Sequence, residues 1–207
     1  MLKGNVPLSP RGMQAGKGSP SRILGVDPGM GSTGFGVIEI TGNGSLLYQE
    51  SGVIRPRGPS TPQRIQHIFR GLVQLIDRFQ PQLMAVERPF FGKNVKSAML
   101  LGQARGAAIL AAAETGVEVQ EYSPLEVKQA VVGYGRAAKE QVQAMVRSIL
   151  RVPQNLSVDA ADALAVALCL AHSLPWQSSL KRAEEKGAGP GRAGSIPGWG
   201  LNSGDHR

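Results

Sequence analysis

The sequence has a single cysteine, Cys169, and it lies in an apolar stretch near the C-terminal end. One cysteine excludes an intramolecular disulfide and favours a reducing compartment, so we expect a cytoplasmic protein in which Cys169 is a small buried hydrophobe. No apolar run approaches the ~20 residues of a membrane-spanning helix. The basic N-terminus also lacks an apolar core, so we expect neither a signal peptide nor a membrane partner.

Acidic residues are scarce as well: 15 stand against 23 lysines and arginines, which gives the 207-residue chain a net charge of +8. A strongly basic protein is expected to bind a polyanion, and nucleic acid is favoured over an anionic membrane surface. Hydrophobic residues make up 42% of the sequence, which is enough for one folded domain with a sizeable core. Because acids are few, the places where they occur in the sequence can indicate a functional site.

Glycine and proline are concentrated at the two ends of the chain. Residues 1–21 are basic, rich in Gly and Pro and poor in residues to bury, so we predict a flexible basic tail. Residues 175–207 are first charged and then Gly-rich, which predicts a disordered tail. The folded domain is predicted to span residues 22–174.

Within this domain, apolar runs and turn signals alternate with helical periodicity. Short apolar or alternating runs predict strands at 22–27, 34–40, 46–55, 83–87 and 117–122. Apolar residues at helical spacing predict helices at 62–79, 96–115, 139–150 and 157–174. A capping box formed by Ser123 and Glu126 predicts another helix that begins after Ser123. Hairpins make the first three strands antiparallel, and helical crossovers make the others parallel. We therefore predict an α/β fold with a five-stranded mixed sheet and helices on both faces.

Four of the acids lie where an unpaired carboxylate is costly. Asp27 and Glu87 end two short apolar runs, and Asp159 and Asp162 lie one turn apart on the last predicted helix. If the two strands are parallel neighbours, their last side chains emerge side by side at the carboxyl edge of the sheet, where ligands bind in open α/β folds. Carboxylates in such places bind a metal, pair with a base or lose their charge.

Carboxylate oxygens without histidine or cysteine ligands suit Mg²⁺, with Mn²⁺ as the alternative, rather than Zn²⁺. Two such ions, ~4 Å apart, can activate a water molecule and stabilise the leaving oxygen in a displacement at phosphorus. A basic protein that gathers acids around metal is thus interpreted as an enzyme that hydrolyses phosphodiesters, with two ions per subunit held by Asp27, Glu87, Asp159 and Asp162.

Five blocks of the sequence resemble the RuvC-type Holliday-junction resolvases, in the order and spacing of that family, over about residues 22–172. The blocks are Ile23–Gly29, Ala85–Glu87, Leu101–Gly106, Val127–Gly133 and Asp159–Ala165. The resemblance implies a ribonuclease H-like fold and a crossover junction endodeoxyribonuclease. Such an enzyme resolves four-way DNA junctions in recombination and repair by paired symmetric nicks, leaving 5′-phosphate and 3′-hydroxyl ends.

The resemblance also implies a homodimer and a branch-migration complex of the RuvA and RuvB type as its partner. It places the four acids named above on the family's catalytic positions. Phe90 matches an aromatic residue that pushes into the junction, and the neighbouring Phe91 competes for that role. Lys128 and Lys139 match basic residues that face DNA phosphates. Candidates to extend this basic surface are Lys93, Lys96, Arg105 and Arg136.

Three other functions remain open from the sequence. An actin-like ATPase also has an aspartate at the end of its first strand, although that fold needs a duplicated domain and this chain has one copy. A noncatalytic junction-binding module would have no use for four clustered acids, which repel phosphates. The third is a ribonuclease H-like nuclease that acts on RNA or on DNA flaps. Only the blocks at 101–106 and around Lys128, which resemble junction resolvases, argue against it.

Overall fold

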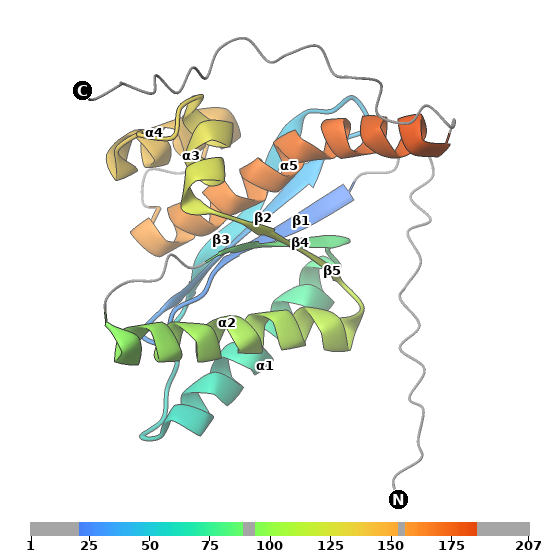
Figure 1. The fold of residues 1–207 in the computed structure, drawn as a ribbon. Coiled ribbons are helices and arrows are strands. Elements are labelled where there is room, and N and C mark those ends of the chain that lie inside the picture. Colours follow the sequence, from blue (N-terminus) through green and yellow to red (C-terminus); the bar gives the residue numbers. More distant parts are fainter. Residues whose placement is uncertain (1–20, 89–93, 153–155, 186–207) are drawn as a thin grey trace, which may run out of the picture. The chain divides into compact units, whose positions relative to one another are not determined.

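The computed structural model describes residues 21–88, 94–152 and 156–185 (Figure 1). The strands are β1 (Ser21–Asp27), β2 (Thr33–Ile40), β3 (Leu46–Ile54), β4 (Leu83–Glu87) and β5 (Glu118–Tyr122). The helices are α1 (Thr61–Phe79), α2 (Val95–Thr115), α3 (Pro124–Val132), α4 (Lys139–Leu150) and α5 (Val158–Glu185). Every predicted strand and helix is present, and apart from the end of α5 the limits agree closely with the prediction.

The five strands form one sheet in the order β3-β2-β1-β4-β5. β1 pairs with β2, and β2 with β3, in antiparallel fashion, whereas β4 lies parallel to both β1 and β5. The predicted mixed sheet is therefore confirmed. The order follows from the connections, because hairpins join neighbours directly while α1 and α2 carry the chain back across a face of the sheet between parallel strands.

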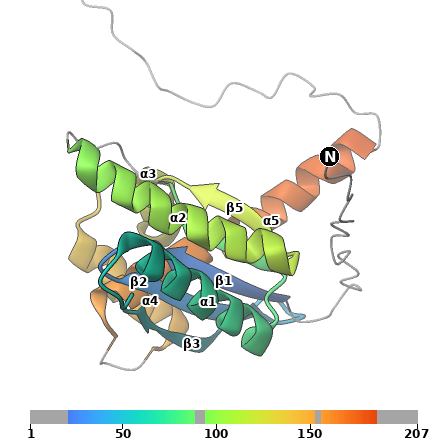
Figure 2. The same ribbon diagram turned by 90° about the horizontal axis from the view of Figure 1, so that it is seen from below.

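Helices cover both faces of the sheet. α1 and α2 pack on one face, and α3, α4 and the first part of α5 lie on the other (Figures 1 and 2). On the α1 and α2 side, the core is built from buried leucines, isoleucines and alanines, among them Ile68, Leu72, Ala104 and Ala108. The alanines of α2 let this helix lie close to the strands. Cys169 is buried in α5, as the sequence predicted.

α5 lies directly against β1 and β2 because two glycines leave room for its backbone. A Cβ atom on Gly25 would overlap the backbone oxygen of Ala163, and one on Gly34 would overlap the backbone oxygen of Asp159. Side chains larger than hydrogen at these positions would push α5 away from the sheet. The first turn of α5 is therefore held over the ends of β1 and β2.

α5 does not end at Leu174 as predicted but continues to Glu185. Pro175 removes only one backbone donor, and the following Leu180–Glu185 segment is rich in helix-forming residues, so the proline does not end the helix. The chain divides into two units, Met1–His172 and Ser173–Arg207. Residues 1–20 and 186–207 lie outside the described residues, so the predicted limits of the domain and its tails stay predictions.

In the part of the chain that the structure describes, none of the helices has the length and apolar character needed to cross a membrane.

Candidate active site

The register of β1 and β4 places the first two acids side by side. In this parallel pair Val26 lies opposite Val86, so Asp27 and Glu87 follow at the same level, at the carboxyl ends of their strands. Residues at equivalent positions of paired strands project to the same face of the sheet. The condition on which the sequence-based prediction depended, that the two strands are parallel neighbours, is confirmed.

The other two acids come from α5. Gly34 pairs with Asp27 across β1 and β2, and the same glycine lies against the backbone of Asp159. Asp159 is in the first turn of α5, and Asp162 follows one turn later. Three elements that are far apart in sequence therefore bring four partly buried carboxylates to one edge of the sheet.

Burial, together with the charges of neighbouring acids, raises the pKa values of Asp27 and Glu87. The pKa of Asp27 is raised to about 7, first by burial and then by repulsion from Glu87, Asp162 and Asp159, while the Lys139 ammonium opposes this effect. Burial likewise raises the pKa of Glu87, followed by the charge of Asp162. Near neutral pH, the cluster without a bound cation therefore retains protons that ordinary carboxyl groups would have released.

A lysine contributes one of the positive charges that the cluster lacks. Lys139, the first residue of α4, places its Nζ 2.6 Å from Oδ2 of Asp162. The hydrogen bond to Asp162 raises the pKa of the Lys139 ammonium above its ordinary value. The sequence placed Lys139 among the residues that face DNA but did not predict that it pairs with a member of the acid cluster.

A cavity of about 200 Å³ opens beside this ion pair. Glu87 and Asp162 line one part of it, and Lys128 and Lys139 bring two ammonium groups to the same space. Val127, Val142 and Val166 form apolar walls. Acids and ammonium groups around one cavity can receive a phosphodiester, because ammonium groups neutralise the phosphate and Glu87 remains available to a cation.

The residues of the cluster fit a divalent cation by their chemistry. All four are carboxylates, and their crowding, seen in the raised pKa of Asp27, is relieved when a cation replaces the protons. Among the described residues, no three Asp, Glu, His or Cys side chains converge into a ready-made metal-binding group. Because Asp162 is paired with Lys139, a cation would compete with the ammonium for this carboxylate.

The remaining residues predicted to bind DNA have different surroundings. Phe90, Phe91 and Lys93 lie outside the described residues. Arg105 in α2 forms an ion pair with Glu121 in β5 and is only partly exposed, so much of its charge is compensated within the protein. Arg136, between α3 and α4, and Lys96, in the first turn of α2, are both exposed. A role for any of these side chains in DNA binding stays a prediction.

Comparison with known proteins shows the family of this chain. The family model described as crossover junction endodeoxyribonuclease RuvC matches residues 23–170. The chain is 50% identical, over 162 residues, to the crossover junction endodeoxyribonuclease RuvC of Pelotomaculum thermopropionicum, covering 77% of this chain and 98% of that protein. It is 46% identical, over 159 residues, to the protein of the same name from Geobacter sp. strain M21, covering 77% and 97%.

A solved structure of Thermus thermophilus RuvC in complex with a Holliday-junction substrate matches this fold with a TM-score of 0.71 and 35% sequence identity. The match covers 76% of this chain and 97% of the Thermus chain. It confirms the predicted ribonuclease H-like fold, and together with the sequence matches it confirms the resemblance on which the predicted catalytic positions depended.

Proposed function

We propose that this chain, which belongs to the RuvC family of crossover junction endodeoxyribonucleases, resolves four-way DNA junctions by paired symmetric nicks at the site formed by Asp27, Glu87, Asp159 and Asp162. The observation that carries the proposal is the gathering of four carboxylates from β1, β4 and α5 at one edge of the sheet. Such a concentration of acids in a basic protein has a clear use in metal-assisted hydrolysis and none in binding phosphate alone.

In this proposal the four carboxylates hold divalent cations, Mg²⁺ first and Mn²⁺ as the alternative, at two ions per subunit. Bound ions supply Lewis-acid chemistry that activates water and stabilises the leaving 3′-oxygen, so the products carry 5′-phosphate and 3′-hydroxyl ends. Lys128 and Lys139 bind the charged phosphate oxygens at the rim of the cavity. The apolar side chains of Val127 and Val142 limit access of other water to the reacting bond.

Paired nicks on opposed strands need two sites, and α2 offers a surface for a homodimer. Val95, Met99 and Leu110 are apolar and exposed, and they share one helix face with Gly102 and Gly106, whose missing side chains leave open space. An exposed apolar stripe interrupted by glycines is typical of a helix-packing interface. A two-fold axis at this stripe would give the two identical sites that symmetric cleavage requires.

The cellular setting of this proposal is the cytoplasm, and it is supported by the single buried cysteine, Cys169. A branch-migration complex of the RuvA and RuvB type stays a predicted partner, by family membership alone.

The proposal is tested by cleavage of an end-labelled, mobile four-way junction beside matched duplex and flap DNA, with Mg²⁺ or with a chelator. We expect paired nicks at symmetric positions on the junction alone and complete loss of cleavage on chelation. Equal cleavage of all three DNAs would replace the junction resolvase with a general nuclease. Tight junction binding without cleavage in Mg²⁺ or Mn²⁺ would instead indicate a noncatalytic module.

The placement of α5 can be tested separately through Gly34. Replacement of Gly34 by alanine is expected to move Asp159 and reduce the cleavage rate at least ~100-fold, because small displacements of catalytic groups have effects of that size. Gly31→Ala is the matched control, since a Cβ there would meet no atom within 4 Å. Single-turnover cleavage rates of the two variants provide the comparison. Equal rates would mean that the contact between β2 and α5 does not position the site.

A further inference from the structure

A second group of basic residues lies at the end of β3 and on the adjoining part of α1. Arg55, Arg57, His67 and Arg78 line one cavity of about 590 Å³, together with apolar residues and Gln74, and no acid lines it. We refer to these four residues as the β3–α1 basic surface. No sequence pattern singles them out, because they are spread over 24 positions and match none of the family blocks.

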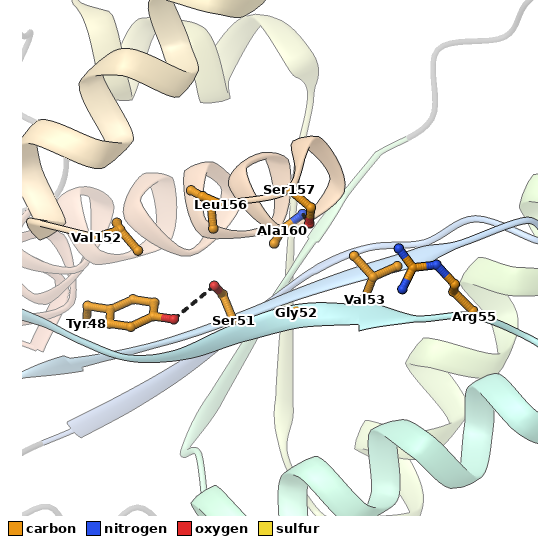
Figure 3. A pocket seen from close by; sticks show the side chains of 9 residues that line it. All are labelled: Tyr48, Ser51, Gly52, Val53, Arg55, Val152, Leu156, Ser157 and Ala160. Atoms are coloured by element: carbon orange, nitrogen blue, oxygen red, sulfur yellow. Dashed lines mark hydrogen bonds between the residues drawn. The ribbon is translucent and has the colours of Figure 1, made fainter. Parts of the chain in front are cut away.

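Arg55 also borders a second cavity, of about 290 Å³, on the α5 side of β3 (Figure 3). The hydroxyl groups of Tyr48 and Ser51, 3.1 Å apart, and that of Ser157 lie around this cavity, and again no acid lines it. Hydroxyl groups and arginines are the side chains that most often contact the sugar-phosphate backbone of DNA. Arg55 therefore lies between two hollows that both suit an anionic chain.

The charges of Arg55 and Arg57 are not compensated by an acid among the described residues. Arg55 and Arg57 are exposed, and within the described residues neither guanidinium group has an ion-pair partner. Arg22 and Arg105, by contrast, pair with Glu39 and Glu121. The backbone around Arg57 is nevertheless ordered, because its N–H donates a 2.8 Å hydrogen bond to Nδ1 of His67. The backbone of Arg57 is held in place, while its guanidinium group remains available to bind an anion.

The sheet register relates this surface to the acid cluster. Asp27 pairs with Gly34, and Gly34 pairs with Val53, so Val53 is level with Asp27 two strands away, about 10 Å at the usual strand spacing. Arg55 follows Val53 beyond the same edge of the sheet. Lys128 acts on Glu87, which lies on the other side of Asp27, in β4. Positive charges therefore flank the acids from both sides along the edge.

We propose that Arg55 and Arg57 bind backbone phosphates of the cleaved junction strand on the β3 side of the scissile phosphate. Because Val53 is already about 10 Å from Asp27 and DNA advances ~3.4 Å per nucleotide, these phosphates lie three or more nucleotides from the cut. The strand runs along the carboxyl edge of the sheet, from the Lys128 side across the acid cluster to the β3–α1 basic surface. This inference rests on the proposed function, because it takes the acid cluster as the point of cleavage. The contacts position the strand and are independent of base sequence.

The test compares Arg55→Gln and Arg57→Gln with Arg70→Gln, an exposed α1 arginine that lines neither cavity. Junction affinity of the full chain is measured in chelator at several salt concentrations. Each of the first two variants is expected to reduce the slope of log affinity against log salt by about 0.7 to 0.9, the value for one lost phosphate contact. Arg70→Gln is expected to leave the slope unchanged, and thermal unfolding checks that all variants fold equally well.

A neutral methylphosphonate, placed at successive positions around the cleavage site, then locates the contact. At one position three or more nucleotides from the cut, on one side of it, the substitution should weaken binding of the wild type but have no further effect on Arg55→Gln. The inference would be overturned if all three variants had the same slope of log affinity against log salt. It would also be overturned if the effects of methylphosphonate and Arg55→Gln on affinity were additive at every position. A wild-type protein that binds junction no better than duplex would overturn the proposed function instead. The salt dependence of the arginine variants would then be measured with duplex DNA.

Discussion

Replacement of Asp27 by asparagine is expected to reduce junction cleavage at least ~10³-fold while leaving junction binding intact, because metal ligands contribute several kcal/mol to the transition state. Asp27 lies between Glu87, at the same level of β4, and Gly34, which contacts the backbone of Asp159, and its pKa responds to the other three acids. Removing its charge spares Lys128 and Lys139, the two lysines of the cavity that are proposed to bind phosphate. Single-turnover cleavage and binding in chelator measure the two effects separately.

The control for this variant is Asp77→Asn, which makes the same chemical change at an exposed position of α1. Asp77→Asn is expected to cleave and bind like the wild type. In chelator, Asp27→Asn should bind the junction as tightly as the wild type or more so, because one charge that repels phosphate is gone. Cleavage by Asp27→Asn at the wild-type rate would contradict the assignment of the site.

The second large effect concerns stability. The metal-free protein is expected to become less stable as the pH rises from about 4 to about 7, because burial raises the pKa of Asp27 from 3.8 to about 7. In this window the native state holds a proton that the unfolded chain has released. The stabilisation is complete below the unfolded-state pKa and is lost as pH passes the folded-state pKa. A shift of this size corresponds to at most about 4 kcal/mol of unfolding free energy.

Calorimetry in chelator between pH 5 and 8.5 measures this effect. Asp27→Asn cannot titrate, so its melting temperature should depend less on pH than that of the wild type and should exceed it above pH 7. Asp77→Asn should follow the wild type. Divalent cations should stabilise the wild type most at high pH, where they no longer compete with protons. Identical pH profiles for wild type and Asp27→Asn would show that the carboxyl group of Asp27 titrates normally.

The site thus carries a cost that the rest of the fold must offset. Four acids at one sheet edge destabilise the protein when no cation is present, and Lys139 compensates only part of the charge through Asp162. Glycines at positions 25 and 34 bring α5 close enough for Asp159 and Asp162 to complete the cluster. In the proposed function the same crowding favours binding of a cation, because a cation relieves the repulsion.

Much of this was accessible from the sequence by itself. Local patterns determined the strands, the helices and the sheet type, because hydrophobic period and turn residues act over a few positions. They also singled out the four acids as candidates, since carboxylates that end apolar runs, as Asp27 and Glu87 do, or that lie one turn apart on an apolar helix, as Asp159 and Asp162 do, are unusual. The parallel pairing that joins these two residues followed from the helical crossovers between their strands.

Only the tertiary structure decided which charges neutralise one another. Two ion pairs join residues far apart in sequence, Lys139 with Asp162 and Arg105 with Glu121. The register likewise brings the exposed Arg55 to the sheet edge that Asp27 occupies. Such contacts depend on strand order, register and the closeness of α5 to the sheet, to within a few ångströms. Local sequence patterns carry no information about these distances, whereas a Coulomb interaction or a hydrogen bond depends on them directly.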